Sequence, residues 1–293
     1  MLTTYLFSPI FLLLCAATAT ASANDVPFEV AKQRIAISDQ RYLVAYNSFN
    51  ANRLGPLYTH NAVQSVPGYP YVQGRKNIVE AFRSSFANVI KLEFNTTSVL
   101  RVAPRVYVTR GTYVTYMRAP AADGGVAPDY GTFRTVYRFV GGTALIALEE
   151  SSAVPTLPAP LPRMSPVQRV VTAQLERFLI TLFERDYANL GRFYAADAEY
   201  ANSAVGAPSV RGRENIVRAN RENSAPVLLR RSRIVQLRRA GPGRFVHTVA
   251  VEYVVQRPNG AVVVLPGRAR ATWRFAAGDA YPVITKMESM LAQ

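Results

Sequence analysis

Residues 74–79 read Gly-Arg-Lys-Asn-Ile-Val, and residues 212–217 read Gly-Arg-Glu-Asn-Ile-Val. The surroundings of the two copies also match. Upstream, LGPLYTHNA at 54–62 corresponds to LGRFYAADA at 190–198; downstream, GTFRTVYRF at 131–139 corresponds to GRARATWRF at 267–275. Three matching blocks in the same order predict a duplicated domain.

The first 23 residues are predicted to be a secretory signal. Residues 6–17 are almost wholly apolar, and Ala21-Ser22-Ala23 has the small-x-small form of a signal-peptidase site. The alternative is a short membrane anchor, but the apolar run is shorter than the ~20 residues that a membrane helix needs. We therefore expect a mature chain that begins near Asn24, has no stable membrane anchor, and is secreted or periplasmic.

The remaining chain divides at a proline-rich segment. Residues 154–166 contain five prolines, as a stiff linker does. Domain 1 is expected at 24–153 and domain 2 at 167–293. In each domain, helix-period segments come first and strand-like segments follow, which predicts an α+β domain with helices on one face of a curved antiparallel sheet. Pro266 falls inside a predicted strand and should mark a bulge or an edge.

This order of elements resembles a known superfamily. A short helix ending in Leu-Tyr-x-x-Asp-Ala, a strand, Gly-Arg, a helix and an antiparallel sheet look like the nuclear-transport-factor-2-like (NTF2-like) fold, and its SnoaL-like branch in particular. The resemblance implies two tandem cone-shaped domains, each with a pocket roofed by helices. It leaves function open, because that fold hosts isomerases, cyclases, dehydratases, binding domains and scaffolds.

The resemblance also implies where a catalytic base would lie. In the ketosteroid-isomerase branch an aspartate follows the Tyr-x-x-Asp-Ala stretch, and that position falls at or near Val66 and Asn202 here. Neither residue titrates, and proton abstraction needs a titratable group within hydrogen-bond reach. Steroid-isomerase-type proton transfer at this position is therefore not expected.

Two residues of domain 2 are the catalytic candidates. Glu252 lies mid-strand, where an unpaired carboxylate is costly, so it either pairs with an arginine or projects into a pocket with a raised pKa. His247 shares the apolar face of the same strand, and such a histidine can equally be a core residue. The two side chains point to opposite faces of a regular strand, so a direct dyad would need a bulge. Any chemistry is thus expected in domain 2.

Aromatic and polar positions of the two repeats form the candidate ligand-binding set. Asn61 and Asp197 have a second interpretation, as cap or turn residues before a strand. The full set is Tyr58, Asn61, Tyr113, Tyr137, Tyr194, Asp197, Asn202 and Trp273.

Composition excludes several classes of site. The only cysteine, Cys15, lies in the signal, and no histidine-rich spacing exists. We therefore expect no disulfide, no metal site and no cofactor. The net charge of +15 comes mainly from arginines without the aromatic interleaving of nucleic-acid binders, so nucleic acid is not an expected partner.

Together these features predict an exported protein that binds a small, largely apolar molecule in one or both cones. The alternatives are an isomerase, cyclase or dehydratase that uses Glu252 or His247, and a structural or interaction module. The domains are expected to pack through their sheets as an intramolecular pseudo-dimer, with Arg134, Arg138, Arg270 and Arg274 at or beside the contact.

Overall fold

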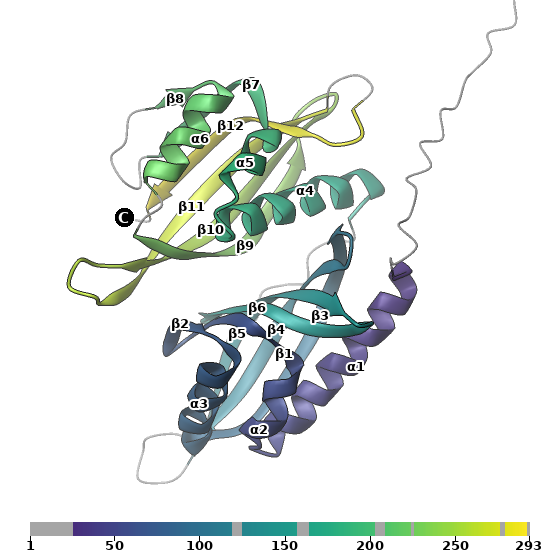
Figure 1. Cartoon of the computed structure of the whole chain (residues 1–293), viewed down its shortest axis with the longest axis vertical. Coiled ribbons are helices and arrows are strands. Elements are labelled where there is room, and N and C mark those ends of the chain that lie inside the picture. Colours follow the sequence, from purple (N-terminus) through teal and green to yellow (C-terminus); the bar gives the residue numbers. More distant parts are fainter. Residues whose placement is uncertain are drawn as a thin grey trace, which may run out of the picture.

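The computed structural model describes residues 26–118, 125–156, 164–202, 209–223, 226–275 and 279–291. The predicted signal at 1–23 lies outside these ranges. Two α+β domains follow one another along the chain, as the repeat predicts (Figure 1). Within the described ranges, no helix is long and apolar enough to cross a membrane.

Domain 1 begins with helices and continues as a six-stranded sheet in the order β2-β1-β6-β5-β4-β3. Its elements are α1 (Phe28–Asn47), α2 (Ala51–Leu54), η1 (Gly55–Leu57), β1 (Tyr58–Val66), β2 (Tyr69–Gln73), α3 (Arg75–Ser85), η2 (Phe86–Asn88), β3 (Val89–Ala103), β4 (Val106–Arg118), β5 (Val126–Val140) and β6 (Thr143–Val154).

Domain 2 repeats this order, with the sheet arranged β8-β7-β12-β11-β10-β9. Its elements are α4 (Pro166–Phe183), α5 (Tyr187–Leu190), η3 (Gly191–Phe193), β7 (Tyr194–Asn202), β8 (Val210–Arg211), α6 (Arg213–Glu222), β9 (Val227–Arg239), β10 (Arg244–Gln256), β11 (Val262–Arg274) and β12 (Val283–Leu291).

The sheets differ from the expected antiparallel pattern at one pairing each. β1 runs parallel to β6, and β7 runs parallel to β12, so both sheets are mixed. These parallel pairs follow from the chain path, because a whole meander separates the first strand from the last. Pro266 produces no bulge against β10. Pro266 pairs with Glu252 of β10, and the pairing of β11 with β12 begins only at the next residue, Gly267. Pro266 therefore lies where β11 is paired with β10 alone.

The repeated hexapeptide is a joint between strand and helix. Gly74 and Gly212 adopt φ of 89° and 88°, a conformation that favours glycine. Arg75 then donates from Nε to the Tyr58 carbonyl at 3.0 Å, and Arg213 donates to the Tyr194 carbonyl at 2.9 Å.

The rest of the hexapeptide completes this joint. Asn77 and Asn215 donate to the carbonyls of Gln73 and Arg211, at 2.8 and 2.9 Å. Ile78 and Ile216 are completely buried. The contacts of these hexapeptide residues therefore stabilise the joint between strand and helix.

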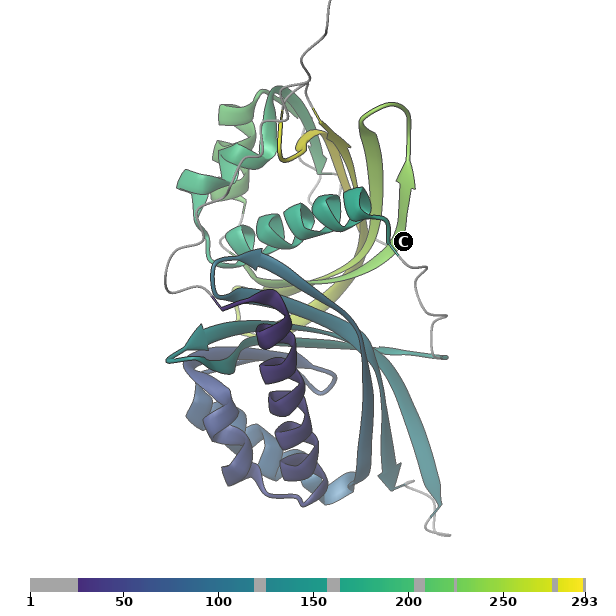
Figure 2. The same ribbon diagram turned by 90° about the vertical axis from the view of Figure 1, so that its right-hand side faces the viewer.

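In each domain the helices cover the concave face of the curved sheet (Figure 2). Separate apolar cores fill the two concave faces, around Tyr58 and Phe82 in domain 1 and around Phe178 and Trp273 in domain 2. The repeat thus produces two structurally equivalent cones.

A third apolar cluster joins the domains. The convex face of the domain 1 sheet supplies Val63, Leu100, Val102, Val108, Val136 and Leu148. On the domain 2 side, the cluster contains residues of α4, the edge strand β9 and the ends of β10 and β11. Examples are Phe183, Leu229 and Val254.

The expected pseudo-dimer of equivalent sheet faces is therefore wrong, because α4 has no counterpart from domain 1 in this contact. Arg134 shows the asymmetry: it is 3% exposed at the interface, whereas Arg270, its match in the second repeat, is exposed. Of the other two arginines, Arg138 pairs with Glu184, the residue just after α4, at the exposed rim, and Arg274 is half-buried.

Candidate functional site

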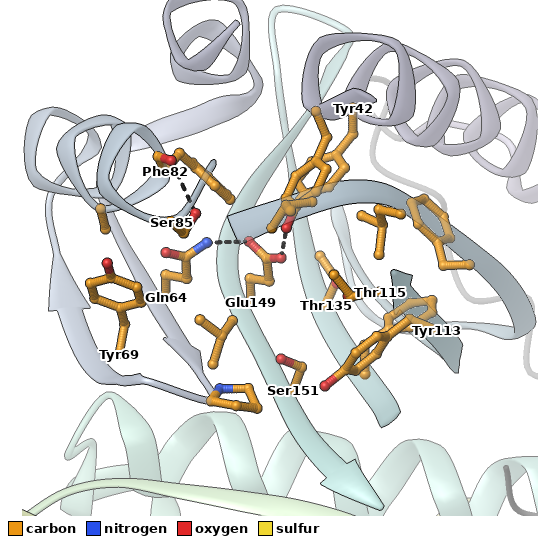
Figure 3. A pocket seen from close by; sticks show the side chains of 18 of the residues that line it. Tyr42, Gln64, Tyr69, Phe82, Ser85, Tyr113, Thr115, Thr135, Glu149 and Ser151 are labelled. Atoms are coloured by element: carbon orange, nitrogen blue, oxygen red, sulfur yellow. Dashed lines mark hydrogen bonds between the residues drawn. The ribbon is translucent and has the colours of Figure 1, made fainter. Parts of the chain in front are cut away.

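The concave face of domain 1 encloses a cavity of about 190 Å³ between α1, α3 and the sheet (Figure 3). Most of its wall is apolar and aromatic. The lining includes Asp39, Tyr42, Gln64, Ala81, Ser85, Tyr113, Tyr137 and Glu149.

Glu149 of β6 forms the first polar centre of this cavity. Tyr42 of α1 donates its hydroxyl to Glu149 Oε1 at 2.9 Å. Tyr58 and Gln64 of β1 both donate to Oε2, Gln64 from Nε2 at 3.1 Å. The parallel register of β1 and β6 places Gln64 directly beside Glu149, so the sheet itself builds this cluster.

The surroundings of Glu149 shift its pKa in two opposing ways. Burial raises the pKa of Glu149 above its usual value, and the three donors pull it back down. The pKa values of Tyr42 and Tyr58 are raised, by burial first and then by the neighbouring carboxylate, so both remain proton donors in hydrogen bonds.

Asp39 of α1 forms the second polar centre. It accepts from the Tyr137 hydroxyl at 2.5 Å and from Thr96 Oγ1 at 3.1 Å. Burial raises the pKa of Asp39, and its two hydrogen bonds oppose that rise. The cavity is thus apolar overall but holds two carboxyl groups, each fixed by hydroxyl donors.

Tyr113 depends on a glycine for its place in the wall. A Cβ on Gly131 would overlap the ring of Tyr113, which packs directly against the glycine backbone. Burial raises the pKa of Tyr113 to about 12, so its hydroxyl is protonated at neutral pH. The tyrosine adds a neutral polar group to the lining.

Domain 2 has a much smaller cavity at the equivalent place. The equivalent space, lined by Leu175, Phe178, Tyr200, Met287 and others, has a volume of about 30 Å³. Position by position, Leu175 stands for Asp39, Phe178 for Tyr42, Tyr200 for Gln64 and Met287 for Glu149. Apolar or aromatic side chains stand where domain 1 has its two polar centres, and they leave little space in the cone.

The predicted ligand-binding residues divide into three groups. Tyr113 and Tyr137 line the domain 1 cavity, and Tyr58 contacts it through Glu149. Asn61 and Asp197 are exposed, and they lie within β1 and β7, so their interpretation as cap or turn residues before a strand is wrong.

In domain 2, Tyr194 and Trp273 are fully buried in the core and do not line its small cavity. The backbone of Asn202 ends β7 beside Ser289, and its side chain lies outside the described part of the chain.

The two catalytic candidates do not form a site together. His247 is completely buried between α4 and Trp273, with Nε2 3.5 Å from Thr172 Oγ1. Burial lowers its pKa to about 4, as expected of a neutral core histidine. Glu252 lies on the opposite face, at the domain interface, where it pairs with Arg231 at 3.0 Å and accepts from Ser152 Oγ at 2.7 Å. Neither residue lines the cone cavity of domain 2.

The structure also bears on metals. Among the described residues, no three or more His, Cys, Asp or Glu side chains gather in a way that could hold an ion.

Comparison with known protein families gives a match to part of domain 1. Residues 40–146 match the model of the SnoaL-like domain. The chain carries a SnoaL-like domain. The match begins within α1 and ends within β6, so it includes Tyr42 and most strands of the cavity wall but neither Asp39 nor Glu149. The structure adds a second domain with the same NTF2-like topology.

Solved structures similar to this chain each span about one domain. A ketosteroid isomerase-like protein from Erwinia carotovora is 21% identical over 45% of this chain and 100% of its own, with a TM-score of 0.40. A putative dehydratase of the NTF2-like family from Streptomyces avermitilis is 16% identical over 44% and 99%, with a TM-score of 0.39. An NTF2-like superfamily protein from Salmonella enterica is 13% identical over 47% and 100%, with a TM-score of 0.39. No curated protein matches the chain.

Sequence reasoning missed Asp39, Gln64 and Glu149. The available signal was a comparison of the two repeats at these positions: polar in the first, apolar or aromatic in the second. Such a difference indicates that one copy retains a polar cavity while the other has filled it.

Proposed function

We propose that the SnoaL-like first domain binds a small, largely apolar molecule in its cone cavity. The observation that carries the proposal is a cavity of about 190 Å³ with a mainly apolar wall and a few convergent polar groups, as small-molecule sites have. The second domain serves as a scaffold in this proposal, because its own cone is filled.

The polar centre suggests one feature of the ligand. A carboxylate oxygen can accept two hydrogen bonds, and Oε1 of Glu149 receives one, from Tyr42. A ligand hydroxyl could supply the second. We therefore expect an apolar body that carries a hydroxyl or a similar donor.

A bulky substitution in the wall tests this proposal. Ala81 of α3 lines the cavity, and Ala219 of α6 is its match in the second repeat. Nile red, a neutral dye that fluoresces in apolar surroundings, should bind the wild-type chain at one site. Binding should be lost in Ala81→Phe and kept in Ala219→Phe.

Equal dye binding by Ala81→Phe and the wild type would sink the proposal. Thermal melts show whether each variant is folded, and Ser85→Phe, at a half-buried position of the same wall, replaces Ala81→Phe if that variant does not fold.

Proton transfer is a second candidate function, favoured by the buried Glu149. A carboxyl group whose pKa is raised by burial, and which is fixed by hydrogen bonds at the wall of an apolar cavity, fits a general acid or base. In this reading the isomerase, cyclase or dehydratase alternative moves from Glu252 to Glu149. Turnover of any substrate that is retained by Glu149→Gln would contradict it.

We also propose that the protein acts after export, since the sequence features of residues 1–23 support a cleaved signal.

A further inference from the structure

A second cavity lies between the domains, on the convex face of the domain 1 sheet. Its volume is about 180 Å³. Domain 1 contributes strands β3 to β6, and domain 2 contributes β9. The polar side chains around it include Thr97, Arg110, Thr112, Thr132, Arg134, Glu150, Ser152, Arg231, Ser232 and Arg233.

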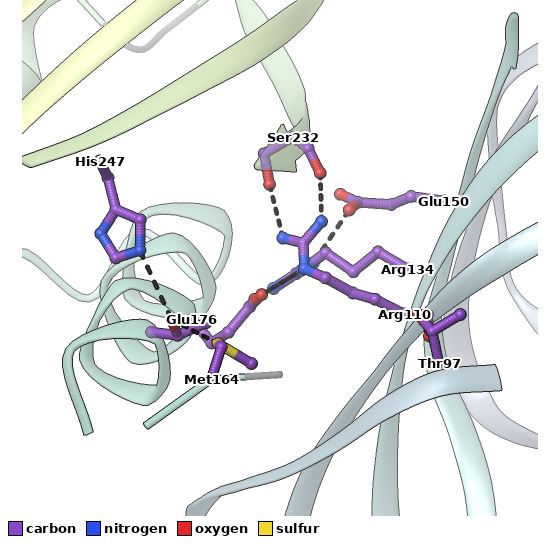
Figure 4. A network of polar contacts seen from close by, with 9 residues as sticks. Thr97, Arg110, Arg134, Glu150, Met164, Glu176, Ser232 and His247 are labelled. Atoms are coloured by element: carbon purple, nitrogen blue, oxygen red, sulfur yellow. Dashed lines mark hydrogen bonds and ion pairs between the residues drawn. The ribbon is translucent and has the colours of Figure 1, made fainter. Parts of the chain in front are cut away.

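Arg134 is the most deeply buried cation of this cavity, at 3% exposure. Figure 4 shows its polar contacts with Glu150 and Glu176. Its Nε donates to Glu176 Oε2 at 2.8 Å, and its Nη1 donates to Glu150 Oε2 at 2.9 Å. The third nitrogen, Nη2, is buried and has no hydrogen-bond partner within the described part of the chain. A buried guanidinium donor without an acceptor lowers the free energy of unfolding. A ligand that supplied an acceptor to Nη2 would remove this cost.

Two further arginines of the cavity are fixed by partners across the interface. Arg110 donates to Glu176 at 2.6 Å and to the Ser232 carbonyl at 2.5 Å. Arg231 donates to the Ser151 carbonyl at 2.8 Å and pairs with Glu252. These contacts hold both guanidinium groups in place before any ligand arrives.

The charges around the cavity do not balance. Glu150, Glu176 and Glu252 are each paired with the arginines just named. Arg233, half-buried on β9, lines the cavity as a fourth cation, and its side chain has no ion-pair partner among the described residues. One positive charge therefore remains, which a bound anion would neutralise.

One acceptor in the cavity is also unpaired. Oε1 of Glu150 is buried and has no donor in the described ranges. A bare anion would be repelled by this oxygen, whereas an anion that carries its own hydroxyl could donate to it. The site thus combines unpaired donors with one acceptor.

We propose that this interdomain cavity binds a small oxyanion that carries a hydroxyl, such as hydrogen phosphate or a small hydroxycarboxylate. The oxyanion accepts from Arg134 Nη2 and from Arg233, and its hydroxyl donates to Glu150. Since a water molecule occupies about 30 Å³ in the liquid, a cavity of about 180 Å³ has room for such an anion. The ligand contacts both domains and so strengthens their contact.

Calorimetric titration of the purified chain with inorganic phosphate, at constant ionic strength in chloride buffer, tests the proposal. We expect one site per chain. Arg233→Gln should weaken binding about tenfold or more, the loss of one charge-assisted hydrogen bond. Arg238→Gln removes the same charge from an exposed position of the same strand, outside the cavity, and should leave the affinity unchanged.

Two further titrations refine the ligand. Sulfate has no hydroxyl at neutral pH and should bind more weakly than phosphate. Lactate separates an organic from an inorganic source, and tighter binding of lactate than of phosphate assigns the site to hydroxycarboxylates.

Failure of both phosphate and lactate to bind the wild-type chain would overturn the proposal. Equal weakening by Arg233→Gln and Arg238→Gln would do the same, since it would mean nonspecific attraction. Sulfate binding as tight as that of phosphate would remove the role of Glu150.

Discussion

Met287 occupies in domain 2 the position that Glu149 occupies in domain 1. In domain 1 the hydroxyl of Tyr58 donates to Glu149; in domain 2 the matching hydroxyl, of Tyr194, lies 3.7 Å from the sulfur of Met287. One replacement of a carboxylate by a thioether removes the acceptor on which the whole polar cluster depends. The two cones therefore share a backbone and differ in chemistry.

This relationship predicts the effect of copying the second repeat into the first. Glu149→Met should leave the Tyr42 and Tyr58 hydroxyls and the Gln64 amide without their acceptor. Each buried donor left unpaired costs about 1–3 kcal/mol, so urea unfolding should show a large loss of stability. Glu149→Gln keeps an acceptor oxygen and removes a buried charge, and should cost much less. Similar losses in the two variants would contradict the assignment.

His247 predicts a pH dependence of stability. Burial lowers its pKa to about 4 from the ordinary histidine value of 6.5. As the pH falls through this window, the unfolded chain takes up a proton that the folded chain refuses, so the free energy of unfolding decreases. The loss between pH 7 and pH 4 should be about 3 kcal/mol.

His247→Gln tests this dependence, because it removes the titrating group and retains hydrogen-bonding capacity. Denaturant unfolding from pH 7 to pH 4 should show a smaller loss for the variant than for the wild type. Parallel curves for the two chains would mean that His247 titrates normally in the folded state.

The buried interface charges predict a contrast between Glu176 within α4 and Glu184, which caps the C-terminus of that helix. Glu176 is fully buried, and Arg110 and Arg134 lower its pKa against the opposing effect of burial. Glu176→Gln should cost about 3–5 kcal/mol, because it leaves buried arginines undercompensated. Glu184→Gln breaks an exposed pair with Arg138 and should cost at most about 1 kcal/mol. Thermal unfolding of both variants measures the difference, and equal effects would argue against a buried network.

Gly131 predicts a steric coupling to Tyr113. Gly131→Ala should displace the Tyr113 ring and destabilise domain 1, whereas the same change in a Tyr113→Ala background should cost less. A double-mutant cycle by urea unfolding measures this coupling. Additive effects would show that the ring does not rest on the glycine.

Export predicts a processed N-terminus. N-terminal sequencing of secreted or periplasmic material should give Asn24 as the first residue. Recovery of exported protein that retains Met1 would contradict cleavage.

The fold could be predicted from sequence because the signals that fix it are local. The glycine with positive φ, the arginine after it and the buried isoleucine occur in both repeats, and each has the same contacts in both domains. The topology follows once two copies of such a unit are recognised.

The site could not be predicted in the same way, because it depends on which face of a strand is concave. Glu149 and Glu150 are adjacent in sequence, yet one lines the cavity and the other pairs with Arg134 at the interface. Alternation shows that they face opposite ways, but it cannot say which faces the helices. Glu252 was expected to pair with an arginine or to enter a pocket, and the structure realises the first alternative through Arg231.

The turn between β5 and β6 has a consequence for sequence change. Gly141 and Gly142, with φ of 55° and 82°, join Val140 to its partner Thr143 by the tightest of hairpin loops. Inserting or deleting one residue between this turn and Glu149 would turn β6 over, because side chains alternate along a strand. The two glutamates would then exchange environments, and the cavity and the interface would each receive the wrong side chain. We therefore expect this short segment to tolerate point substitutions far better than changes in length.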